Sequence, residues 1–410
     1  SQMQFDSALA QKKIERAIDR LKPMANTNAL LLMNGIDHAD PEPRIPAVIA
    51  SANTQIDDVE IVQGTLADHL AAVRASGADL KEFEGEFRWG RYSEILQGVY
   101  STRIHLKQQN HEAETRLERY VEPLAALVWL SNAEVPAGIS DLVALAWRWL
   151  LLNHPHDDMY GSGIDEVHHE MLYRFSQTRQ IGEALIRDSL RQIARQIDLT
   201  AQSGTPILVF NPLGWRRREI VEAQVDFEFD DPTPDSFHVV DSRGNVIPHQ
   251  VMDDTERFWM EVLKPNRKRR LTLLLQADVP PCGYATYFVK AGSAGSASTD
   301  LRVHEHGAEN SFIGFSIDPD GGLTITDKTT GYIYSDLGHI YDVADAGDEY
   351  SFCPVPGDAP VTTKGQPATV IALEQQDACA VVFRIERRLE LPSGLDATRQ
   401  RRSGDTTAMD

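Results

Sequence analysis

The chain has 410 residues, which is enough for two to four domains at about 100 to 200 residues each and for a large core without disulfides. Its 27 glycines and 21 prolines are close to average usage, and its three cysteines are too few and too widely spaced for a disulfide framework or a zinc site. The 40 basic and 61 acidic residues give a net charge of −21, which repels nucleic acid and anionic lipid and favours a neutral or cationic ligand.

Apolar runs are all short, and the longest, such as residues 142–147, fall far below the roughly 18 residues that a membrane-spanning helix needs. The first 22 residues are polar and charged, without the apolar core of a secretory signal. The sequence therefore predicts a soluble, cytoplasmic protein that binds neither membrane nor nucleic acid.

The N-terminal region begins with a helical stripe, because Ile14, Ile18 and Leu21 recur at helical spacing before Pro23. Residues 29–33 then form a continuous apolar run, which is typical of a strand buried on both faces of a parallel sheet. This alternation predicts an α/β domain.

The alternation continues through a helix over residues 46–52, a strand over 59–62 and a helix that opens with the capping box Thr65-x-x-Asp68. Two strands cannot form a covered sheet by themselves. We therefore expect residues 1–91 to be the C-terminal part of a parallel α/β domain whose remaining part precedes Ser1.

Residues 92–200 follow a helical period and predict a three-helix bundle. Its last helix is expected to begin with the capping box Ser162-x-x-Asp165 and to run toward Ile197.

After Gly204 the pattern changes to short strands separated by turns. A Gly/Ser-rich stretch over residues 292–298 predicts a linker between a β domain over 201–297 and the start of a large β-sandwich domain over 298–410. Within the second domain, residues 312–326 are expected to form a hairpin around the turn 318–322. The fold class is thus multidomain α/β + α + β, with a remnant of a parallel α/β domain, a three-helix bundle and β-sandwich domains.

Asp37 directly follows the apolar run over residues 29–33, at the strand end where α/β folds place catalytic groups. Its carboxyl is a candidate general acid. An Asx-turn or a helix cap is the alternative for an aspartate in such a loop. The neighbouring pair of His38 and Asp40 is a coincidence of composition and predicts no metal site.

Residues 153–158, Asn-His-Pro-His-Asp-Asp, form the richest polar cluster and lie between two helices. Imidazole and carboxylate groups are ready metal ligands, whereas helix capping is the alternative use of such residues. The following His168-His169-Glu170 lacks the spacing of a metalloprotease motif and predicts a solvated helix face.

Tyr350 lies in a Gly/Asp-rich loop of the β region, where an aromatic hydroxyl could stack on and hydrogen-bond a sugar. A tyrosine that anchors its own loop is the alternative. The sequence has none of the P-loop, G-x-G-x-x-G, G-x-S-x-G or C-x-x-C patterns.

Several segments together resemble glycoside hydrolase family 38, the retaining α-mannosidases, and particularly its bacterial members. The segments that carry the resemblance span most of the chain: 34–38, 100–107 with Asn110, 122–124, 153–157 with Gly161, 164–168, 210–213, 279–283 and 347–350.

The resemblance implies a metal-dependent hydrolase that removes terminal α-D-mannosyl residues from a mannoside or oligosaccharide, with one zinc ion at the sugar site. Position by position, it implies that His156 is a metal ligand, that Asp157 and Tyr350 contact substrate and that Asp37 is the catalytic acid/base. Arg103, at the entrance to the bundle, is expected to be structural. Bacterial members of the family often pair, which allows a homodimer.

The family's nucleophile and its other metal ligands belong to an N-terminal segment with no counterpart here. Retaining hydrolysis needs two carboxyl groups about 5 to 5.5 Å apart, so we expect the isolated chain to be inactive. A metal held by His156 alone lacks the three or four protein ligands of a stable site, so we also expect little bound zinc. The alternative reading is a non-catalytic carbohydrate-binding or scaffold chain.

Overall fold

The computed structural model describes residues 7–35, 38, 40–85, 95–131, 138–200, 203–228, 236–261, 264–294 and 299–409. The chain divides into two compact units, Ser1–Arg88 and Trp89–Asp410. None of the helices in the described ranges combines the length and the hydropathy needed to cross a membrane.

The first unit is built from helices. They are α1 (Ser7–Leu21), the 3-10 helix η1 (Lys22–Met24), α2 (Ile45–Asn53) and α3 (Leu66–Ala75). Ile18 is buried, which confirms the centre of the predicted apolar stripe of α1. The helix ends at Leu21, just before Pro23, as expected. The capping box of α3 is confirmed as well, since Thr65 N–H donates to Asp68 Oδ2 at 2.8 Å and Asp68 N–H donates to Thr65 Oγ1 at 3.2 Å.

The strands expected over residues 29–33 and 59–62 are not formed, because the described part of the first unit contains helices, turns and irregular segments only. Met33 and Val62 are 77% and 72% exposed, so these apolar runs are not buried either. A strand is stable only when a neighbouring strand pairs with its N–H and C=O groups, and no described strand of this unit pairs with either run. The N–H and C=O of Ile61 instead bond the side chain of Asn53, at 2.8 and 2.9 Å.

The second unit begins with a group of helices. They are the 3-10 helix η2 (Gln97–Tyr100), α4 (Ile104–Thr115), the π-helical η3 (Arg116–Val121), α5 (Glu122–Leu130), α6 (Ile139–Leu151), the short α7 (His156–Tyr160) and α8 (Asp165–Ala194). Helices α4, η3 and α5 are continuous in sequence, and the π-helical stretch lies just before Pro123, which has no N–H to donate to the preceding turn.

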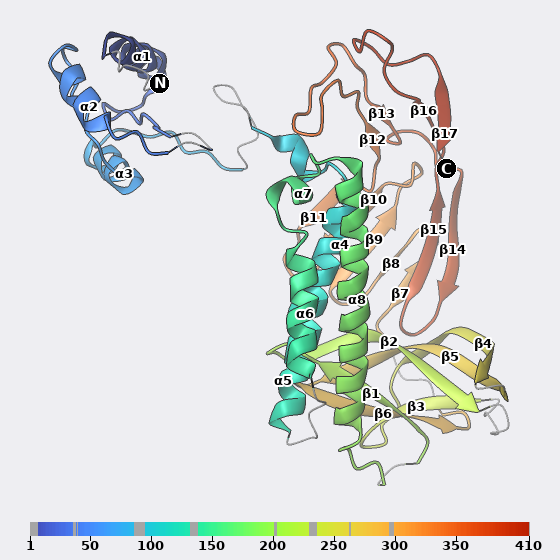
Figure 1. Cartoon of the computed structure of the whole chain (residues 1–410). Helices are drawn as coiled ribbons and strands as arrows, with labels where there is room; N and C mark the ends of the chain where they lie inside the picture. Colours follow the sequence, from blue (N-terminus) through green and yellow to red (C-terminus); the bar gives the residue numbers. More distant parts are fainter. Residues whose placement is uncertain are drawn as a thin grey trace. The chain divides into compact units, whose positions relative to one another are not determined.

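The long helix α8 runs alongside α4 and α6 (Figure 1). Their shared core consists of buried apolar side chains from α4, η3, α6 and α8: Leu106, Ala113, Leu117, Val121, Ala146, Leu150, Met171, Phe175 and Leu185. The predicted capping box at the start of α8 is wrong, because the cap position is Ile164, without a side-chain cap, and Ser162 Oγ has no hydrogen-bond partner among the described residues.

The rest of the second unit is antiparallel β structure, with these strands: β1 (Thr205–Asn211), β2 (Arg217–Glu228), β3 (Phe237–Asp241), β4 (His249–Glu261), β5 (Lys264–Val279), β6 (Gly283–Ala291), β7 (Arg302–His304), β8 (Gly307–Glu309), β9 (Ile313–Ile317), β10 (Leu323–Asp327), β11 (Ile333–Leu337), β12 (Tyr341–Asp342), β13 (Val361–Thr362), β14 (Val370–Gln376), β15 (Val381–Glu386), β16 (Leu389–Pro392) and β17 (Thr406–Met409).

Two three-stranded sheets, β1-β6-β3 and β2-β5-β4, enclose one apolar core that includes Val239, Leu271, Leu273 and Leu275. A five-stranded sheet follows in the order β11-β10-β9-β8-β7, and the predicted hairpin is confirmed in its strands β9 and β10. Three two-stranded pairs, β12-β13, β14-β15 and β16-β17, complete the described β structure.

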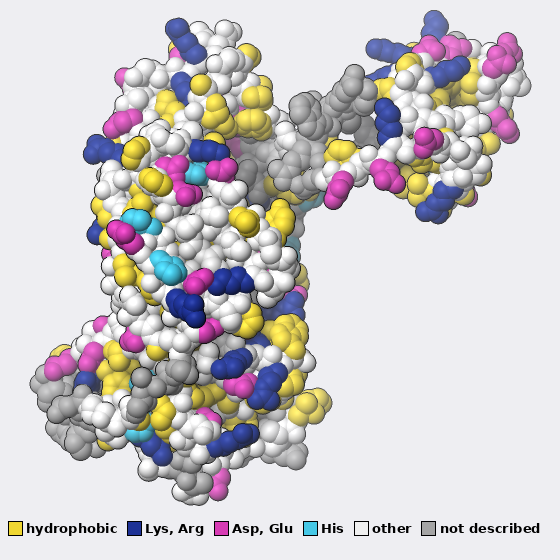
Figure 2. Space-filling view, turned by 180° about the vertical axis from the view of Figure 1, so that it is seen from behind, with side chains coloured by type: hydrophobic (Ala, Val, Ile, Leu, Met, Phe, Trp, Pro, Cys, Tyr) yellow, Lys and Arg dark blue, Asp and Glu magenta, His cyan; other side chains and the backbone are white. Residues whose placement is uncertain are grey.

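The helices and the first sheets are joined by packing, since Phe210 of β1 lies against a small core formed by Leu124, Val128 and Ile193. Acidic and basic side chains are interspersed over the face drawn in Figure 2.

Candidate functional site

The predicted pair His156 and Asp157 starts the five-residue helix α7. Pro155 precedes the helix, and Gly161 ends it in the left-handed conformation with φ +85°. The side chains of His156 and Asp157 are 78% and 66% exposed, and His156 Nε2 lies 3.6 Å from Asp157 Oδ1. The two predicted site residues therefore lie side by side and open to a ligand.

The other polar residues of the 153–158 cluster are used within the protein. Asn153 is completely buried and donates its side-chain N–H to the carbonyl of Met171 at 3.3 Å. His154 Nε2 lies 2.9 Å from Asn110 Oδ1, and Asp158, whose side chain is 17% exposed, faces Arg174 at 3.6 Å. Asn153, His154 and Asp158 are thus engaged within the protein, none of them as a helix cap, and the metal-ligand reading of His156 stays a prediction.

Tyr350 is 37% exposed and lies in the loop between β12 and β13; we call residues 345–353 the Tyr350 loop. Two aspartates shape the loop from inside. Asp348 Oδ1 accepts hydrogen bonds from the N–H groups of Tyr350 (3.0 Å) and Ser351 (2.9 Å), and Asp345 Oδ1 accepts from Gly347 (2.7 Å) and Cys353 (2.8 Å). From outside, Arg399 Nη2 donates to the carbonyls of Ala346 and Gly347 at 2.9 and 2.8 Å.

The Tyr350 loop also contacts the Gly98–Arg103 turn (residues 98–103) at the entrance to the helices. Gly98 N–H donates to the Tyr350 carbonyl at 2.9 Å, and Thr102 Oγ1 donates to the Glu349 carbonyl at 2.8 Å. A Cβ on Gly98 would lie 2.9 Å from both the carbon and the oxygen of the Tyr350 carbonyl. Only glycine therefore allows this approach of two backbones.

The same turn holds the end of α7 through Arg103. Its Nε donates to the Gly161 carbonyl at 3.1 Å, and its Nη2 contacts Asp165 Oδ1 at 2.7 Å, just past the α7 turn. Arg103 itself is left-handed with φ 49° and ψ 47°, a conformation that costs about 1 to 2 kcal/mol in a non-glycine residue. The structural role expected of Arg103 agrees with these contacts, and the turn supports both α7 and the Tyr350 loop.

Burial and neighbouring charges shift the pKa of three ionisable groups near this support. The hydrogen bond from Arg103, together with its charge, lowers the pKa of Asp165. Burial lowers the pKa of Lys107, whose Nζ donates to the carbonyl of Thr102 at 2.6 Å. Burial and the charge of Arg103 lower the pKa of His168, which favours the uncharged imidazole.

His168 also corrects a prediction. The sequence predicted a solvated face for residues 168–170, but His168 is 3% exposed, whereas His169 and Glu170 are exposed as expected. The spacing contained the signal, because His168 continues at helical spacing the stripe that runs through Met171 and Phe175.

Asp37, the predicted acid, lies outside the described residues, as do its neighbours Ile36 and Ala39. It belongs to the first unit, whereas His156, Asp157 and Tyr350 belong to the second. Its role therefore stays a prediction.

The donor set offered to a metal is incomplete among the described residues. They contain no group of three or more histidine, cysteine, aspartate or glutamate side chains that could hold an ion. Around α7 they supply the imidazole of His156 and the adjacent carboxylate of Asp157, whereas protein zinc sites use three or four ligands. The residues present thus do not by themselves fit a zinc ion.

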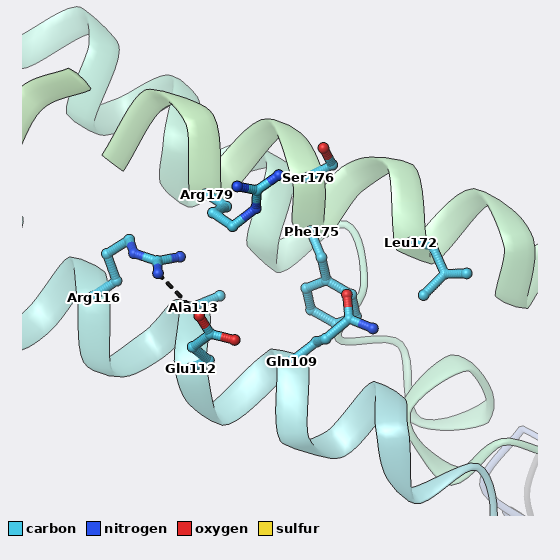
Figure 3. A pocket seen from close by; sticks show the side chains of 8 residues that line it. All are labelled: Gln109, Glu112, Ala113, Arg116, Leu172, Phe175, Ser176 and Arg179. Carbon is cyan, nitrogen blue, oxygen red and sulfur yellow. Dashed lines mark hydrogen bonds and ion pairs between the residues drawn. The ribbon is translucent and has the colours of Figure 1, made fainter. Parts of the chain in front are cut away.

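A separate hollow of about 150 Å³ lies between α4 and α8 and is shown in Figure 3. Arg116 and Arg179 reach its rim from the two sides, and Phe175 lines it. Both guanidinium groups have carboxylate partners one turn away, Glu112 at 2.9 Å and Glu183 at 3.3 Å. None of the predicted site residues lines this hollow.

Comparison with known proteins gives three kinds of match. The family of the alpha mannosidase middle domain matches residues 94–193. A protein of Halalkalibacterium halodurans named "Putative mannosylglycerate hydrolase" is 27% identical over 405 residues, covering 91% of this chain and 44% of that protein. Human "Alpha-mannosidase 2C1" is 28% identical over 206 residues, covering 50% of this chain and 16% of that protein.

Two crystal structures from Enterococcus faecalis have similar folds. One, of a protein in glycosyl hydrolase family 38, has a TM-score of 0.69 at 26% identity and covers 99% of this chain and 50% of its own. The other, of an alpha-mannosidase, has a TM-score of 0.71 at 27% identity and covers 96% of this chain and 49% of its own. The chain spans about half the length of these proteins or less. Residues 94–193 thus match the alpha mannosidase middle domain, and the chain as a whole is similar to about half of a protein in glycosyl hydrolase family 38.

Proposed function

We propose that this chain forms one side of the active site of a retaining, metal-dependent α-mannosidase that hydrolyses terminal α-D-mannosyl residues. The observation that carries the proposal is the Gly98–Arg103 turn, which supports the Tyr350 loop and the end of α7 together. Side chains from the helices and from a β loop about 190 residues later are thereby fixed to one support, which is how a cleft is built from rigid elements.

In this proposal Asp157 binds sugar hydroxyls. Its carboxylate is 66% exposed and lies 3.6 Å from the imidazole of His156, which is 78% exposed, so the carboxylate oxygens can accept hydrogen bonds from a ligand. Asp158, which faces Arg174, is not free to do so.

Tyr350 supplies the second sugar contact. Its loop is fixed through backbone groups, namely the Tyr350 carbonyl and the N–H groups that Asp345 and Asp348 bind. The loop is therefore held without using the phenol, and a partly exposed tyrosine can stack on a sugar ring and hydrogen-bond it through the hydroxyl.

Asp37 is the proposed acid/base carboxyl and His156 one ligand of the metal. Retaining hydrolysis also needs a second carboxyl about 5 to 5.5 Å from the first, and zinc needs two or three more ligands than His156. Because the described residues do not complete either set, we propose that the 410-residue chain alone shows no turnover and binds zinc weakly.

Two substrate types fit the relatives. An α-mannoside without a specified aglycone follows from the names of the alpha-mannosidases, and a small mannoside with an acidic aglycone follows from the protein named for mannosylglycerate, which matches 91% of this chain. We propose that the α-mannosidic bond is cleaved in both substrate types. The ratio of the kcat/KM values for the two types decides which aglycone is preferred.

The test measures cleavage of an aryl α-mannoside and of mannosylglycerate by the complete natural polypeptide that contains these residues, and by the 410-residue chain alone, each with and without a chelator. We expect chelator-sensitive turnover by the complete polypeptide, and a loss of about 100-fold or more in kcat/KM in its Asp37→Asn and His156→Ala variants. Unchanged turnover in these variants would refute the site, and turnover by the 410-residue chain would refute its incompleteness. Sugar binding without any turnover by the complete polypeptide would favour a carbohydrate-binding or scaffold role.

A further inference from the structure

The buried face of α8 begins with the one ionisable residue on that face. Positions at spacings of three and four form a buried stripe along the helix: His168, Met171, Phe175, Thr178, Gly182, Leu185, Ser189 and Ile193. An apolar side chain is the ordinary occupant of such a position. The first position holds an imidazole that is 3% exposed.

The burial of the imidazole is not compensated by a well-formed hydrogen bond, although the carbonyls of Ile164 and Asp158 interact with the ring. Neither Nδ1 nor Nε2 of His168 has a hydrogen-bond partner among the described residues, and the hydroxyl of Ser162, in the turn before α8, is also buried without one. Buried polar groups without partners are costly and rare, so their presence in a fold calls for an explanation. Ordinary packing does not supply it, because a methionine would fill a similar volume without the cost.

The ring packs under the turn that ends α7. A Cβ on Gly163 would lie 3.4 Å from Cε1 of His168, so the ring contacts this turn. The turn is attached to α7 by the hydrogen bonds that the N–H groups of Gly161 and Ser162 donate to the Asp157 carbonyl, at 3.1 and 3.2 Å. A movement of the ring would therefore be passed to the backbone of Asp157.

The charges around His168 favour its neutral form. Burial and the guanidinium of Arg103 lower its pKa, while the Asp158 carboxylate and the carbonyls of Ile164 and Asp158 oppose this shift in part. Asp158 also faces Arg174 at 3.6 Å, and Asp165 pairs with Arg103 at 2.7 Å, so both nearby carboxylates already have cationic partners. An imidazolium at this position would be poorly compensated.

Helix α7 is the element next to His168 that can detach from the rest of the protein most easily. It has five residues between Pro155 and the left-handed Gly161, none of them fully buried, and of these Met159 packs partly buried against the helical core. Segments with little buried surface open at low free energy, whereas α8 buries a stripe along its whole length.

We propose that His168 is a positioning residue for α7: its neutral ring supports the turn over residues 161–163, and its protonation releases α7 together with His156 and Asp157. The role of α7 in binding a ligand rests on the proposed function, but its release on protonation of His168 does not. We call the form with α7 in place and the ring buried the closed form, and the form with α7 released the open form. Because the pKa of His168 is lower when the ring is buried, the open form takes up the proton first as the pH falls. The closed form is thus fully stable above the ordinary histidine pKa of about 6.5 and loses stability as the pH falls below it.

Hydrogen exchange of the 410-residue chain tests this without substrate or metal. The rate for peptides covering residues 153–164 is divided by the rate for peptides from the middle of α8, which cancels the intrinsic pH dependence of exchange. We expect this ratio to rise at least about fivefold between about pH 7.5 and about pH 5.5, the low end of typical coupling between two sites. His168→Met should abolish the rise, whereas His169→Gln, the matched control at the neighbouring exposed position, should retain it.

His154 and His156 also lie in the measured segment, so His154→Gln and His156→Gln are included and should retain the rise. A wild-type ratio that does not change with pH, or a rise that persists in His168→Met, overturns the proposal. If α8 loses its protection in His168→Met, His168→Gln decides in the same way. The proposed hydrolase activity could fail with this result intact, and the reverse also holds, so the two failures are distinguishable.

Discussion

Helix α7 and the Tyr350 loop both contact the Gly98–Arg103 turn, but different kinds of interaction hold them there. The Tyr350 loop is held by a close approach of two backbones at Gly98 and by the Thr102 hydroxyl. Helix α7 is held by the long side chain of Arg103, through a carbonyl and an ion pair with Asp165. The first attachment depends on space and the second on charge, so substitutions and solution conditions should affect them separately.

Gly98→Ala should have the largest effect, because its Cβ would lie 2.9 Å from the Tyr350 carbonyl and the neighbouring backbone cannot move aside cheaply. Overpacking and the loss of the hydrogen bond from Gly98 should lower the free energy of unfolding by about 2 to 3 kcal/mol. Urea unfolding measures the change, and limited proteolysis near residue 350 shows whether the loop has been released.

Gly214→Ala is the matched control, since a Cβ there meets nothing within 4 Å. It should change the free energy of unfolding by less than about 0.5 kcal/mol. Equal effects of the two substitutions would contradict the close backbone contact.

Arg103→Ala should come second and should loosen α7 while leaving the Tyr350 loop protected. Loss of the bond to the Gly161 carbonyl and of the partly exposed ion pair should cost about 1 to 2 kcal/mol in the free energy of unfolding. Hydrogen exchange over residues 153–164 and 345–353 separates the two attachments, and faster exchange of both segments alike would show that they are not independent.

Arg103→Gly refines this result, because it loses the same side chain but relieves the left-handed backbone at φ 49°. It should be about 1 kcal/mol more stable than Arg103→Ala. Arg179→Ala, which removes an exposed pair on the surface of α8, should cost less than about 0.5 kcal/mol.

Asp165→Asn should give a smaller, pH-dependent effect. The pKa of Asp165 is lowered by Arg103, so the unfolded chain takes up this proton first as the pH falls. The ion pair therefore stabilises the folded chain above the ordinary aspartate pKa of about 3.9, and this contribution is lost as the pH falls through the lower folded pKa. The melting temperature should therefore fall less at acid pH in Asp165→Asn than in the unsubstituted chain. Glu166→Gln should show the same fall as the unsubstituted chain.

His156→Gln and Asp157→Asn should have the smallest effect on stability. Their side chains are 78% and 66% exposed and the helix they begin buries no residue, so each should change the free energy of unfolding by less than about 0.5 kcal/mol. Asn153→Ala, in the same cluster but completely buried, should cost more, about 1 to 3 kcal/mol. Urea unfolding of the three variants would sharpen the division between ligand-facing and structural residues, and a reversed order would contradict it.

The sequence predicted local features well where their determinants are local. Thr65-x-x-Asp68 forms a capping box because both partners lie within one turn and nothing else competes for them. Ser162-x-x-Asp165 has a similar pattern but fails, because Arg103, 62 residues away, takes the Asp165 carboxylate and the turn buries the Ser162 hydroxyl. The local sequence of the apolar run over residues 29–33 does not determine whether it forms a strand, because a strand depends on a pairing partner elsewhere in the chain.

The candidate site shows the same limit. Family resemblance pointed to His156, Asp157 and Tyr350, and the structure places the first two next to one another and the third on a loop with a shared support. The supporting residues Gly98 and Thr102, and the buried state of His168, were missed. Their roles arise from contacts between segments far apart in the chain, which a pattern within one segment does not reveal.

The hydrogen bond from Thr102 to Glu349 joins residues 247 positions apart. During synthesis the helices would emerge and could pack long before the ribosome had made the Tyr350 loop. Contacts at such separation also form late in refolding, because closing a long loop costs entropy before it gains anything. Ligand-binding ability should therefore lag behind helix formation when the chain folds, and an early stop in translation would yield well-packed helices with an unfinished cleft.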